Sequence, residues 1–399
     1  SSWEIPADSP FASLSGEPAA SGEASLLIDD ATADDGSNVQ SAPIEAPEPG
    51  LYQLRGRVYP VSGNGLGVYV RQFDADGNGT GASSHVIGLG GTEQQWQDFS
   101  GLLFVPDETA TLRVWIHSYR AARVKAYLDD LEIVFMHGID VEMKDDLDTI
   151  KQRLIDRELP SRASEESVLG LVNTLKKDGS WPEIDYADDS SASWRPSSHV
   201  GRLLSMARAW ATPDHPLHHN PRVLEAFLRA YDFWMAEDPM CPNWWYNEIG
   251  VPRQLYRAML LIEDELTEQQ NAAGLNMLAR AKLGMTGQNL VWVSEVTIAR
   301  GCLADDPMLV MAAFKAIESE IKITTDEGIQ PDFSFYQHGD QLYSGGYGRG
   351  FSVDCPRFAA LARGTGFAFD EEKLEILAAY LLDGQQWMIR GATFDFSAC

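Results

Sequence analysis

The spacing of apolar residues changes once along this chain, near residue 140, and no other feature constrains the fold as strongly. Before this point apolar residues alternate at period two, as at Leu66, Val68 and Val70. Such alternation is typical of a strand with one buried face. After it they recur three and four residues apart, as over residues 200–211, which indicates amphipathic helices. The 399 residues exceed one ordinary domain, so we predict a multidomain protein, first all-β and then all-α.

The same pattern predicts where the parts begin and end. Residues 1–136 contain segments rich in Val, Tyr, Phe and Trp, separated by clusters of Gly, Asp and Asn. Regular strands punctuated in this way favour a β-sandwich. Residues 137–160 are charged and only weakly periodic, and we expect a connecting helix there. Residues 161–399 are predicted to be helices joined by aromatic-rich loops.

Composition excludes several classes of protein. The chain has 31 Lys and Arg against 59 Asp and Glu, a net charge of −28, which disfavours nucleic acid and anionic membranes as partners. It has no run of eighteen apolar residues, so no transmembrane helix is expected. Its four cysteines, the last being Cys399, form no CxxC pair, which argues against structural zinc. The chain starts at Ser1 without a leader, so we expect a processed or trimmed product.

Three segments of the second half hold more aromatic and polar residues than a core requires. They are NWWYNEIG at 243–250, TGQNLVW at 286–292 and DFSFYQHGDQLYSGGYG at 332–348. Trp244 and Trp245 are adjacent and cannot both face the core side of one helix. At least one should therefore line a surface or cleft, where a flat ring can stack on a sugar.

The other two segments supply proton-transfer and amide groups. His338, Tyr343 and Tyr347 lie in a glycine-rich stretch, and glycine permits close approach of a ligand. Asn289 follows a glycine at an expected loop–helix junction. Each segment also has a structural interpretation when taken alone. These are an aromatic plug between helices, a helix N-cap at Asn289, and an aromatic turn packed on the core.

Taken together and in this order, the three segments resemble the polysaccharide lyase family that cleaves hyaluronan, chondroitin and xanthan. The matching pieces are NWWYNEIGVPRQL at 243–255, TGQNLVW at 286–292 and PDFSFYQHGDQLYSGGYG at 331–348. The resemblance implies that residues 161–399 form an incomplete α/α toroid, which in the family precedes antiparallel β domains. It also implies that residues 1–136 are similar to the jelly-roll, carbohydrate-binding-like domain of broad-specificity chondroitin lyases.

The resemblance also implies a role for individual residues. Asn289 matches the Asn that binds the uronate carboxylate, His338 the catalytic His, and Tyr347 the Tyr that acts as base and acid. Trp244 and Trp245 match the aromatic patch that positions the sugar chain. Further substrate-binding residues are expected at Asn243, Arg253 and Tyr343. A family Arg and a family Glu follow beyond the position of Cys399, so we expect a missing C-terminal part of the same protein to complete the site.

The chemistry of uronate elimination explains these residue types. An amide donor such as Asn289 stabilises the enolate-like charge that develops when the C5 proton leaves. Tyr347 has an ordinary pKa of about 10, and a nearby cation such as protonated His338 would lower it. Alternatively, His338 itself removes the proton of an iduronate. No metal or organic cofactor is required.

We therefore predict a secreted or periplasmic lyase that cleaves glucuronate-containing chondroitin sulfate or hyaluronan by β-elimination, giving 4,5-unsaturated uronate products. Two alternatives stay open: a lyase for xanthan or alginate, and a catalytically silent glycan-binding protein. Arginines near the motifs either form a basic cleft for the acidic polymer or pair with carboxylates. These are Arg195, Arg253, Arg257, Arg349 and Arg390.

One residue of the first half suggests a metal. Asp129 lies in phase with Leu131, Ile133 and Phe135, which predicts that its carboxylate faces inward. A buried carboxylate needs compensation. Carbohydrate-binding-like sandwiches hold a structural calcium ion at such an Asp, and a hydrogen-bonded Asp is the alternative.

Overall fold

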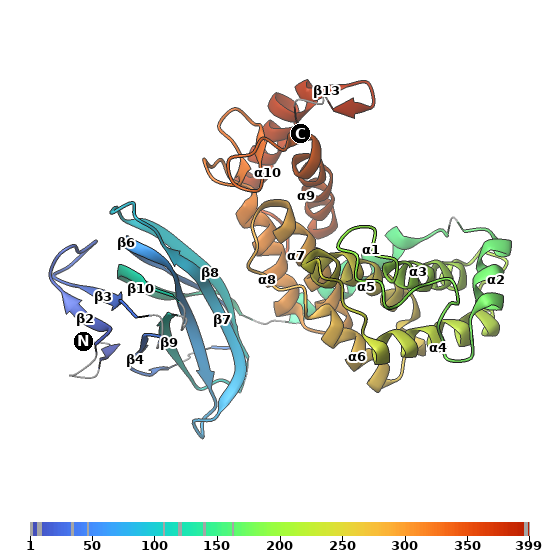
Figure 1. Ribbon diagram of the computed structural model, residues 1–399, viewed down its shortest axis with the longest axis horizontal. Helices are drawn as coiled ribbons and strands as arrows, with labels where there is room; N and C mark the ends of the chain where they lie inside the picture. The colour runs from blue at the N-terminus through green and yellow to red at the C-terminus, as the bar shows by residue number, and fades with distance from the viewer. Residues whose placement is uncertain are drawn as a thin grey trace. The chain divides into compact units, whose positions relative to one another are not determined.

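The computed structural model divides the chain into two compact units, Ser1–Ile139 and Asp140–Cys399 (Figure 1). It describes residues 3–5, 10–32, 36–45, 48–106, 108–118, 122–138, 141–161, 163–394 and 398. The division falls close to the predicted boundary at residue 136. The helix expected over 137–160 corresponds to α1 (Val141–Glu158), which packs on other helices of the second unit.

The first unit consists of strands. They are β1 (Trp3–Glu4), β2 (Ala12–Ser15), β3 (Ser25–Asp30), β4 (Asn38–Ser41), β5 (Ile44–Glu45), β6 (Gly50–Phe73), β7 (Gly79–Gly90), β8 (Gln97–Val105), β9 (Thr111–Ser118) and β10 (Val124–Gly138). Every pairing among them in the described residues is antiparallel.

The long strand β6 belongs to two sheets and joins them into a sandwich. Its first part pairs with β8 and β10, and its second part pairs with β7 and β9. Strands β3 and β2 extend the first sheet beyond β10, and β4 and β1 extend the second beyond β9. Between the two parts, Gly63 adopts a φ of 73°, and an added Cβ would lie 1.8 Å from the carbonyl oxygen of Arg123. Only glycine fits at this bend.

The core of the sandwich lies on the faces that the alternation predicts. Leu66, Val68 and Val70 on β6 are completely buried, as is Ile116 on β9. Along β9 buried and half-buried residues alternate without interruption. The predicted β-sandwich is therefore confirmed.

Asp129 does not face inward, and the phase argument for it is wrong. A β-bulge follows Asp129 on β10, where Asp130 has a φ of 52°, so the phase that linked Asp129 to Leu131 is broken. Its carboxylate accepts hydrogen bonds from the backbone N–H groups of Ala20 (2.8 Å) and Ser21 (3.1 Å). No group of three or more His, Cys, Asp and Glu in the described residues could hold a metal ion. The structure removes the argument that Asp129 faces inward. A calcium ion at Asp129 stays a prediction.

The second unit consists mainly of helices. They are α1, α2 (Glu165–Thr174), α3 (Ser197–Ala211), α4 (Pro221–Glu237), α5 (Val251–Ile262), α6 (Glu268–Leu278), α7 (Gly287–Leu303), α8 (Pro307–Glu320), α9 (Arg349–Ala362) and α10 (Glu371–Ala379). Three π-helical turns, η1 (Tyr246–Gly250), η3 (Ser344–Gly348) and η4 (Tyr380–Gly384), and two 3₁₀ turns, η2 (Glu263–Glu265) and η5 (Gln385–Met388), flank them. Short strand pairs are β11 (Gly328–Ile329) with β12 (Phe335–Tyr336), and β13 (Ile389–Arg390) with β14 (Thr393–Phe394).

Helix α7 is the centre of this unit. All of its residues except Trp292 and Arg300 are buried, and it packs on α1, α5, α8 and α9. A helix that is buried on all sides belongs in a core, and α7 is buried although it contains polar residues such as Gln288, Asn289 and Glu295. Trp292, one of the two exceptions, is part of the candidate site. The prediction of an all-α second half is confirmed.

None of the described helices is long and apolar enough to cross a membrane. Cys241, Cys302 and Cys355 are buried free thiols, and Cys399 lies outside the described residues.

Candidate active site

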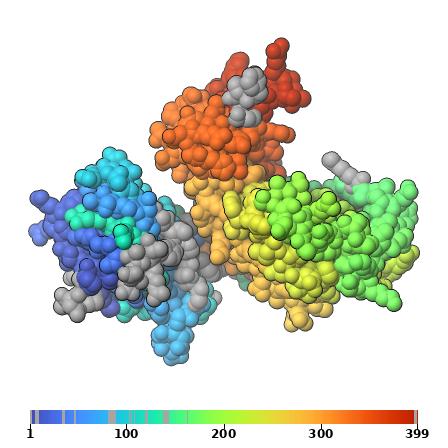
Figure 2. Space-filling model, viewed as in Figure 1, coloured from blue at the N-terminus to red at the C-terminus, as the bar shows by residue number. Residues whose placement is uncertain are grey.

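The three motif segments meet in the folded helical unit through their aromatic rings. The ring centroid of Trp245 lies 6.0 Å from that of Trp292, and the ring of Trp292 lies 5.7 Å from that of Tyr347. Figure 2 shows a hollow in the surface between the helices of residues 160–250 (green) and the lobe formed by the C-terminal residues (orange and red). The rings therefore connect segments that are separated by up to about a hundred residues in sequence.

His338 and Tyr347 form a hydrogen-bonded pair. Nε2 of His338 lies 3.1 Å from the hydroxyl oxygen of Tyr347, and the two rings are perpendicular at 89°. The ring of Tyr343 lies 5.0 Å from that of Tyr347 and 6.1 Å from that of His338. Tyr347 is in the π-helical turn η3, and such turns are frequent at functional sites. The pair can exchange a proton directly.

Asn289 is the third residue of α7 and is 8% exposed. Its amide oxygen is buried and has no hydrogen-bond partner in the described residues. A buried polar group without a partner costs about 1–3 kcal/mol. The amide thus keeps free hydrogen-bonding capacity one helical turn before Trp292.

Glu327 ties the loop that carries His338 to the start of α7. Its carboxylate accepts hydrogen bonds from the Thr286 hydroxyl (2.6 Å), the Gly339 backbone N–H (2.8 Å) and the side-chain amide of Gln337. The amide oxygen of Gln337 in turn accepts the backbone N–H of Gln288 (3.0 Å). These contacts hold the His338 loop and the N-terminus of α7 in one arrangement.

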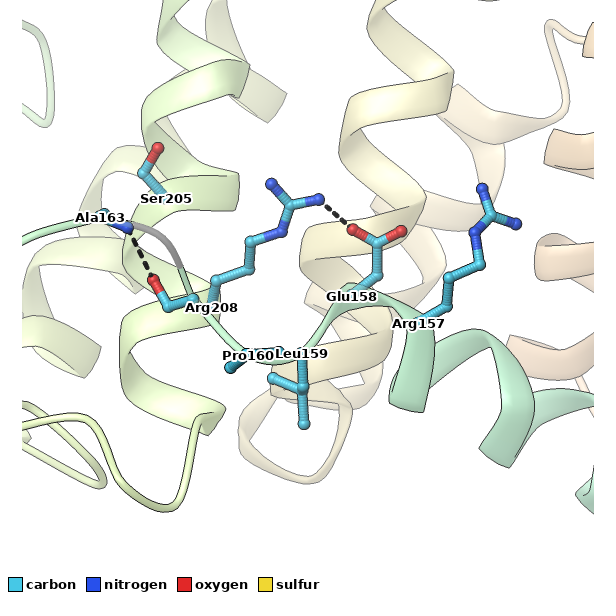
Figure 3. A pocket seen from close by; sticks show the side chains of 8 residues that line it. Arg157, Glu158, Leu159, Pro160, Ala163, Ser205 and Arg208 are labelled. Atoms are coloured by element: carbon cyan, nitrogen blue, oxygen red, sulfur yellow. Dashed lines mark hydrogen bonds and ion pairs between the residues drawn. The ribbon is translucent and has the colours of Figure 1, made fainter. Parts of the chain in front are cut away.

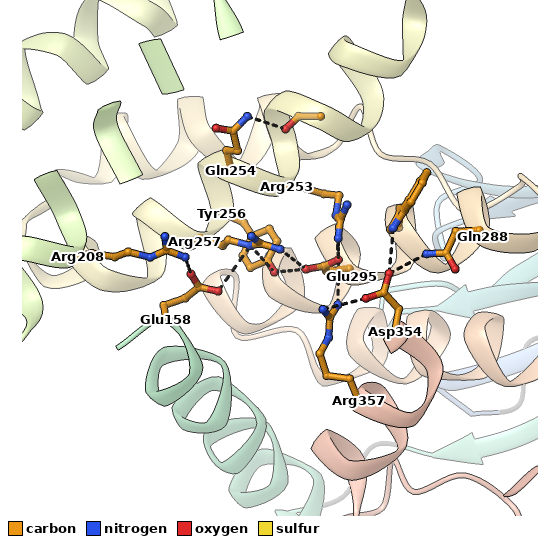
Figure 4. Close-up of polar contacts among 12 residues, drawn as sticks. Glu158, Arg208, Arg253, Gln254, Tyr256, Arg257, Gln288, Glu295, Asp354 and Arg357 are labelled. Carbon is orange, nitrogen blue, oxygen red and sulfur yellow. Dashed lines mark hydrogen bonds and ion pairs between the residues drawn. The ribbon is translucent and has the colours of Figure 1, made fainter. Parts of the chain in front are cut away.

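Asp354 fixes the orientation of Trp292. The buried carboxylate of Asp354 accepts hydrogen bonds from Nε1 of Trp292 (3.0 Å) and from Nε2 of Gln288 (2.8 Å). It also pairs with Arg357 at 2.9 Å, and Figure 4 shows Asp354 and Arg357 on α9 facing Glu295 of α7. The indole of Trp292, which lies between the rings of Trp245 and Tyr347, is therefore held by the carboxylate of Asp354 on α9.

Glu295 joins α5, α7 and α9 below the site. Its completely buried carboxylate pairs with Arg253 (2.7 Å), Arg257 (2.8 Å) and Arg357 (3.3 Å), and accepts the Tyr256 hydroxyl (2.6 Å). Burial alone would raise the pKa of Glu295, but the three arginines hold it well below its ordinary value. Arg253, expected at the substrate, is thus paired with Glu295, and its guanidinium lies 5.3 Å from the ring centre of Trp292.

The remaining arginines near the motifs divide into two groups. Arg257 is paired with Glu295 and Glu158. Arg195, Arg349 and Arg390 are exposed and have no ion pair with any residue that the structure describes. Arg349 directly follows the turn that carries Tyr347, but its charge is not among the causes that shift the pKa of Tyr347.

The adjacent tryptophans differ as the sequence indicates. Trp244 is 46% exposed, which confirms that at least one of the two lies at the surface. Trp245 packs over Gly250, where an added Cβ would lie 2.6 Å from the ring. Asn243, expected to bind substrate, accepts the backbone N–H of Trp245 (3.1 Å) and donates to the carbonyl oxygen of Ser191 (3.1 Å).

The electrostatics at Tyr347 differ from the sequence-based expectation. A neighbouring cation was expected to lower its pKa, but the pKa is raised, chiefly by burial and further by Tyr343 and Glu327. A raised pKa means that the hydroxyl is protonated at neutral pH. The hydroxyl of Tyr347 must therefore give up its proton before its oxygen can act as a base.

Sequence reasoning missed the residues that hold the site together. These are Glu295, Glu327, Gln337 and Asp354. The signal for two of them was available: Glu295 and Asp354 are charged residues at buried helical positions, where the neighbours in phase are apolar.

The chain belongs to polysaccharide lyase family 8, because the family model for the N terminal alpha-helical domain of this family matches residues 146–398. It is 30% identical over 253 residues to chondroitinase-AC of Pedobacter heparinus, covering 62% of this chain and 36% of that one. It is 24% identical over 209 residues to xanthan lyase of Bacillus sp. (strain GL1), covering 46% and 22%.

Solved structures agree with this assignment. A structure of chondroitinase AC lyase, described with oligosaccharide complexes, superposes with a TM-score of 0.61 at 29% identity, over 63% of this chain and 38% of that one. A Paenibacillus xanthan lyase, at 22% identity and a TM-score of 0.54 over 62% and 26%, shows the fold alone. The chain spans about a third of the length of the first relatives it matches.

Proposed function

We propose that this protein is a polysaccharide lyase that cleaves glucuronate-containing glycosaminoglycans, chondroitin sulfate or hyaluronan, by β-elimination. One observation carries the proposal: His338 and Tyr347 form a hydrogen-bonded pair within a family 8 helical domain. The ring of Tyr347 contacts Trp292, and Trp292 lies one turn after Asn289, whose amide oxygen has no partner in the described residues. Relatives named chondroitinase-AC and hyaluronate lyase, the latter from Thermasporomyces composti at 26% identity, support this substrate class.

The proton transfers follow from the raised pKa of Tyr347. Tyr347 donates its hydrogen bond to Nε2 of His338, and it transfers that proton to His338 as its oxygen removes the C5 proton of the uronate. The C5–H and C4–O bonds break and a C4–C5 double bond forms. Tyr347 then gives the proton from C5 to the departing glycosidic oxygen, and His338 returns its proton. All protons are accounted for without a metal or organic cofactor.

Asn289 supplies the electrostatic part of the mechanism. When the C5 proton leaves, negative charge spreads onto the uronate carboxylate. An amide donor that is already desolvated stabilises this charge without reorganising, and such a donor is worth about 10²–10³ in rate. This role needs the side-chain nitrogen of Asn289 to face the carboxylate, because the amide oxygen, which is buried without a partner, can only accept a hydrogen bond.

The polymer needs stacking and positive charge to bind. Trp244 offers an exposed ring, and Arg349 offers a guanidinium without an ion pair to any described residue. The net charge of −28 repels an acidic polymer at long range, but salt screens this repulsion beyond about 8 Å at physiological ionic strength.

We propose that the protein acts outside the cytoplasm, in a secreted or periplasmic form, where such polymers occur.

Xanthan stays the second candidate substrate, since a xanthan lyase is among the relatives. The alternative in which His338 removes the proton of an iduronate uses the same pair, and the exposed side chain of His338 is accessible to a substrate. A contribution from residues beyond Cys399 stays a prediction of the family resemblance.

Replacement of Tyr347 by Phe tests the proposal. The variant loses only the hydroxyl, so we expect elimination to fall by about 10²–10⁴ while binding of the polymer stays within a few-fold of wild type. The measurement is ultraviolet absorbance of the unsaturated uronate during incubation with hyaluronan, chondroitin sulfate, xanthan and alginate. Tyr336→Phe is the matched control, because Tyr336 of β12 has no assigned role in binding or proton transfer, and it should keep most of the activity.

Two results would overturn the assignment. Wild-type protein that produces no absorbance with any of the four polymers, yet binds one of them, would support the silent glycan-binding alternative. Equal activity of Tyr347→Phe and wild type would remove Tyr347 from the mechanism.

A further inference from the structure

A polar pocket lies at the far end of α3 from the candidate active site. Trp194 precedes the start of α3, and its ring contacts Tyr246 of the NWWYNEIG segment at 5.7 Å. Arg208 lies in the last turn of the same helix, about 16 Å further along at 1.5 Å per residue. The pocket beside Arg208 is therefore separate from the site that holds His338 and Tyr347.

The pocket has the size of a small-ligand site. Its volume is about 480 Å³, within the range of about 300–1,000 Å³ that ligand pockets occupy. Residues of the α1 end, the following loop and α3 line it (Figure 3): Arg157, Glu158, Leu159, Pro160, Ser161, Ala163, Ser205 and Arg208. Polar groups thus approach the space from three separate elements.

The one carboxylate in the lining is already neutralised. Glu158 is buried, and its two oxygens pair with Arg208 and, at 3.6 Å, with Arg257. Arg157, by contrast, forms no ion pair with any residue that the structure describes. Burial, and the like charges of Arg357 and Arg257, lower the pKa of Arg157. The lining therefore has an excess of positive charge although the protein carries a net charge of −28.

The charges behind the pocket do not balance this excess, and the side chain of Arg157 itself is exposed. The cluster connected by ion pairs holds four arginines against three carboxylates: Arg208, Arg253, Arg257 and Arg357, with Glu158, Glu295 and Asp354. Figure 4 shows it running from Arg208 to Asp354. A surplus of like charges is costly where water is partly excluded. An anion in the pocket would relieve it.

Hydrogen-bond donors in the pocket are also unused. Arg208 uses one terminal nitrogen of its guanidinium for Glu158, and its Nε has no partner in the described residues but is buried and not accessible from the pocket. The hydroxyl oxygen of Ser161 accepts the backbone N–H of Ala163 (3.2 Å), while its own proton has no acceptor there. Arg157, Ser161 and Arg208 all line the same pocket. Arginine donors match the oxygens of sulfate and phosphate in particular.

We propose that this pocket binds a tetrahedral oxyanion, a sulfate or phosphate group, between Arg157, Arg208 and Ser161. A tetrahedral group presents oxygens in several directions and so uses donors from all three elements, which a planar carboxylate does less well. The group is either a free inorganic anion or the sulfate of an acidic sugar. Binding of this anion can be measured directly and does not depend on lyase activity.

Isothermal titration of the whole chain with sodium sulfate and sodium phosphate, at constant ionic strength set with NaCl, tests the proposal. We expect saturable binding of one anion per chain. Arg157→Gln should weaken it about tenfold or more, the loss expected for one charge-assisted hydrogen bond. Ser161→Ala, which keeps every charge, should weaken it by a smaller factor. Arg363→Gln is the matched control, since Arg363 is exposed, has no ion pair to a described residue and lies outside the pocket.

Competition identifies the source of the group. Displacement of free sulfate by a sulfated disaccharide, but not by its unsulfated counterpart, would assign the group to a sugar. Binding of sulfate without such displacement would assign it to a free anion, and both results support the site. The absence of saturable binding of both anions, or equal weakening by Arg157→Gln and Arg363→Gln, overturns the proposal.

Discussion

His199 is a histidine that folding keeps neutral. Its ring is completely buried and lies 4.7 Å from Trp181 and 5.2 Å from Trp234. Nε2 lies 2.9 Å from the carbonyl oxygen of Ala230 and therefore carries the proton, while Nδ1 accepts the hydroxyl of Tyr186 at 2.9 Å. Both nitrogens are satisfied in the neutral form. Burial lowers the pKa of His199 to about 4.

The free energy of unfolding of the helical unit should therefore depend on pH. An unfolded histidine has a pKa of about 6.5, so between pH 6.5 and pH 4 the unfolded chain binds a proton that the folded chain does not. His199 contributes fully above pH 6.5, and we expect about 3 kcal/mol to be lost as the pH falls to 4. Urea unfolding at pH 7 and pH 4.5 measures this loss.

His199→Gln is the control for this prediction. A glutamine amide can donate to Ala230 and accept from Tyr186 without titrating, so the variant should lose less stability on acidification than wild type. A variant with the same pH dependence as wild type would show that other groups cause the effect.

Helix α7 has its N-terminus in the core, so its first backbone N–H groups need partners there. The N–H of Gly287 donates to Glu320, and that of Gln288 donates to Gln337 at 3.0 Å. Gly287 has a φ of 56°, and a Cβ at this position would lie 2.2 Å from the amide oxygen of Gln337. A glycine is therefore required where the loop enters the helix that presents Asn289.

Gly287→Ala should impair both folding and activity. Its left-handed backbone alone costs about 1 kcal/mol for alanine, and displacement of Gln337 should bring the total loss to about 3 kcal/mol. Because Gln337 also contacts Glu327, we expect activity to fall at least about tenfold. Gly364→Ala is the matched control, with a φ of 76° and nothing within 4 Å of the added Cβ. Equal effects of the two substitutions would contradict the role assigned to Gln337.

At the scale of the whole molecule, the two units have separate cores. The sandwich buries its own cluster of aliphatic and aromatic side chains, and the helical unit is built around α7. Compact units with independent cores unfold as separate cooperative transitions. We expect two transitions in calorimetry of the intact chain.

Acidification distinguishes the two transitions. Between pH 7 and pH 4.5 the transition of the helical unit should move to lower temperature through His199, and His199→Gln should reduce that shift without moving the other transition. A single transition at both pH values would contradict the independence of the two units.

Sequence patterns determined the parts of this protein that depend on one element at a time. The change of period near residue 140 located the two units, because a strand repeats every two residues and a helix every 3.6. The alternation at Leu66, Val68 and Val70 predicted the buried face of β6. The ordered motifs at 243–255, 286–292 and 331–348 indicated the family, which the match to residues 146–398 established.

Only the tertiary structure decided what depends on contacts between distant residues. A bulge at Asp130 turned Asp129 outward, and a register shift of this kind is set by the partner strand. The raised pKa of Tyr347 follows from burial and from Tyr343 and Glu327. The pairing of Arg253 with Glu295 follows from the contact between α5 and α7. The pocket beside Arg157 needs both the end of α1 with its following loop and the end of α3, which are about fifty residues apart in sequence. Local periodicity contains no information about such packing, because each of these properties arises from side chains that only the folded chain brings together.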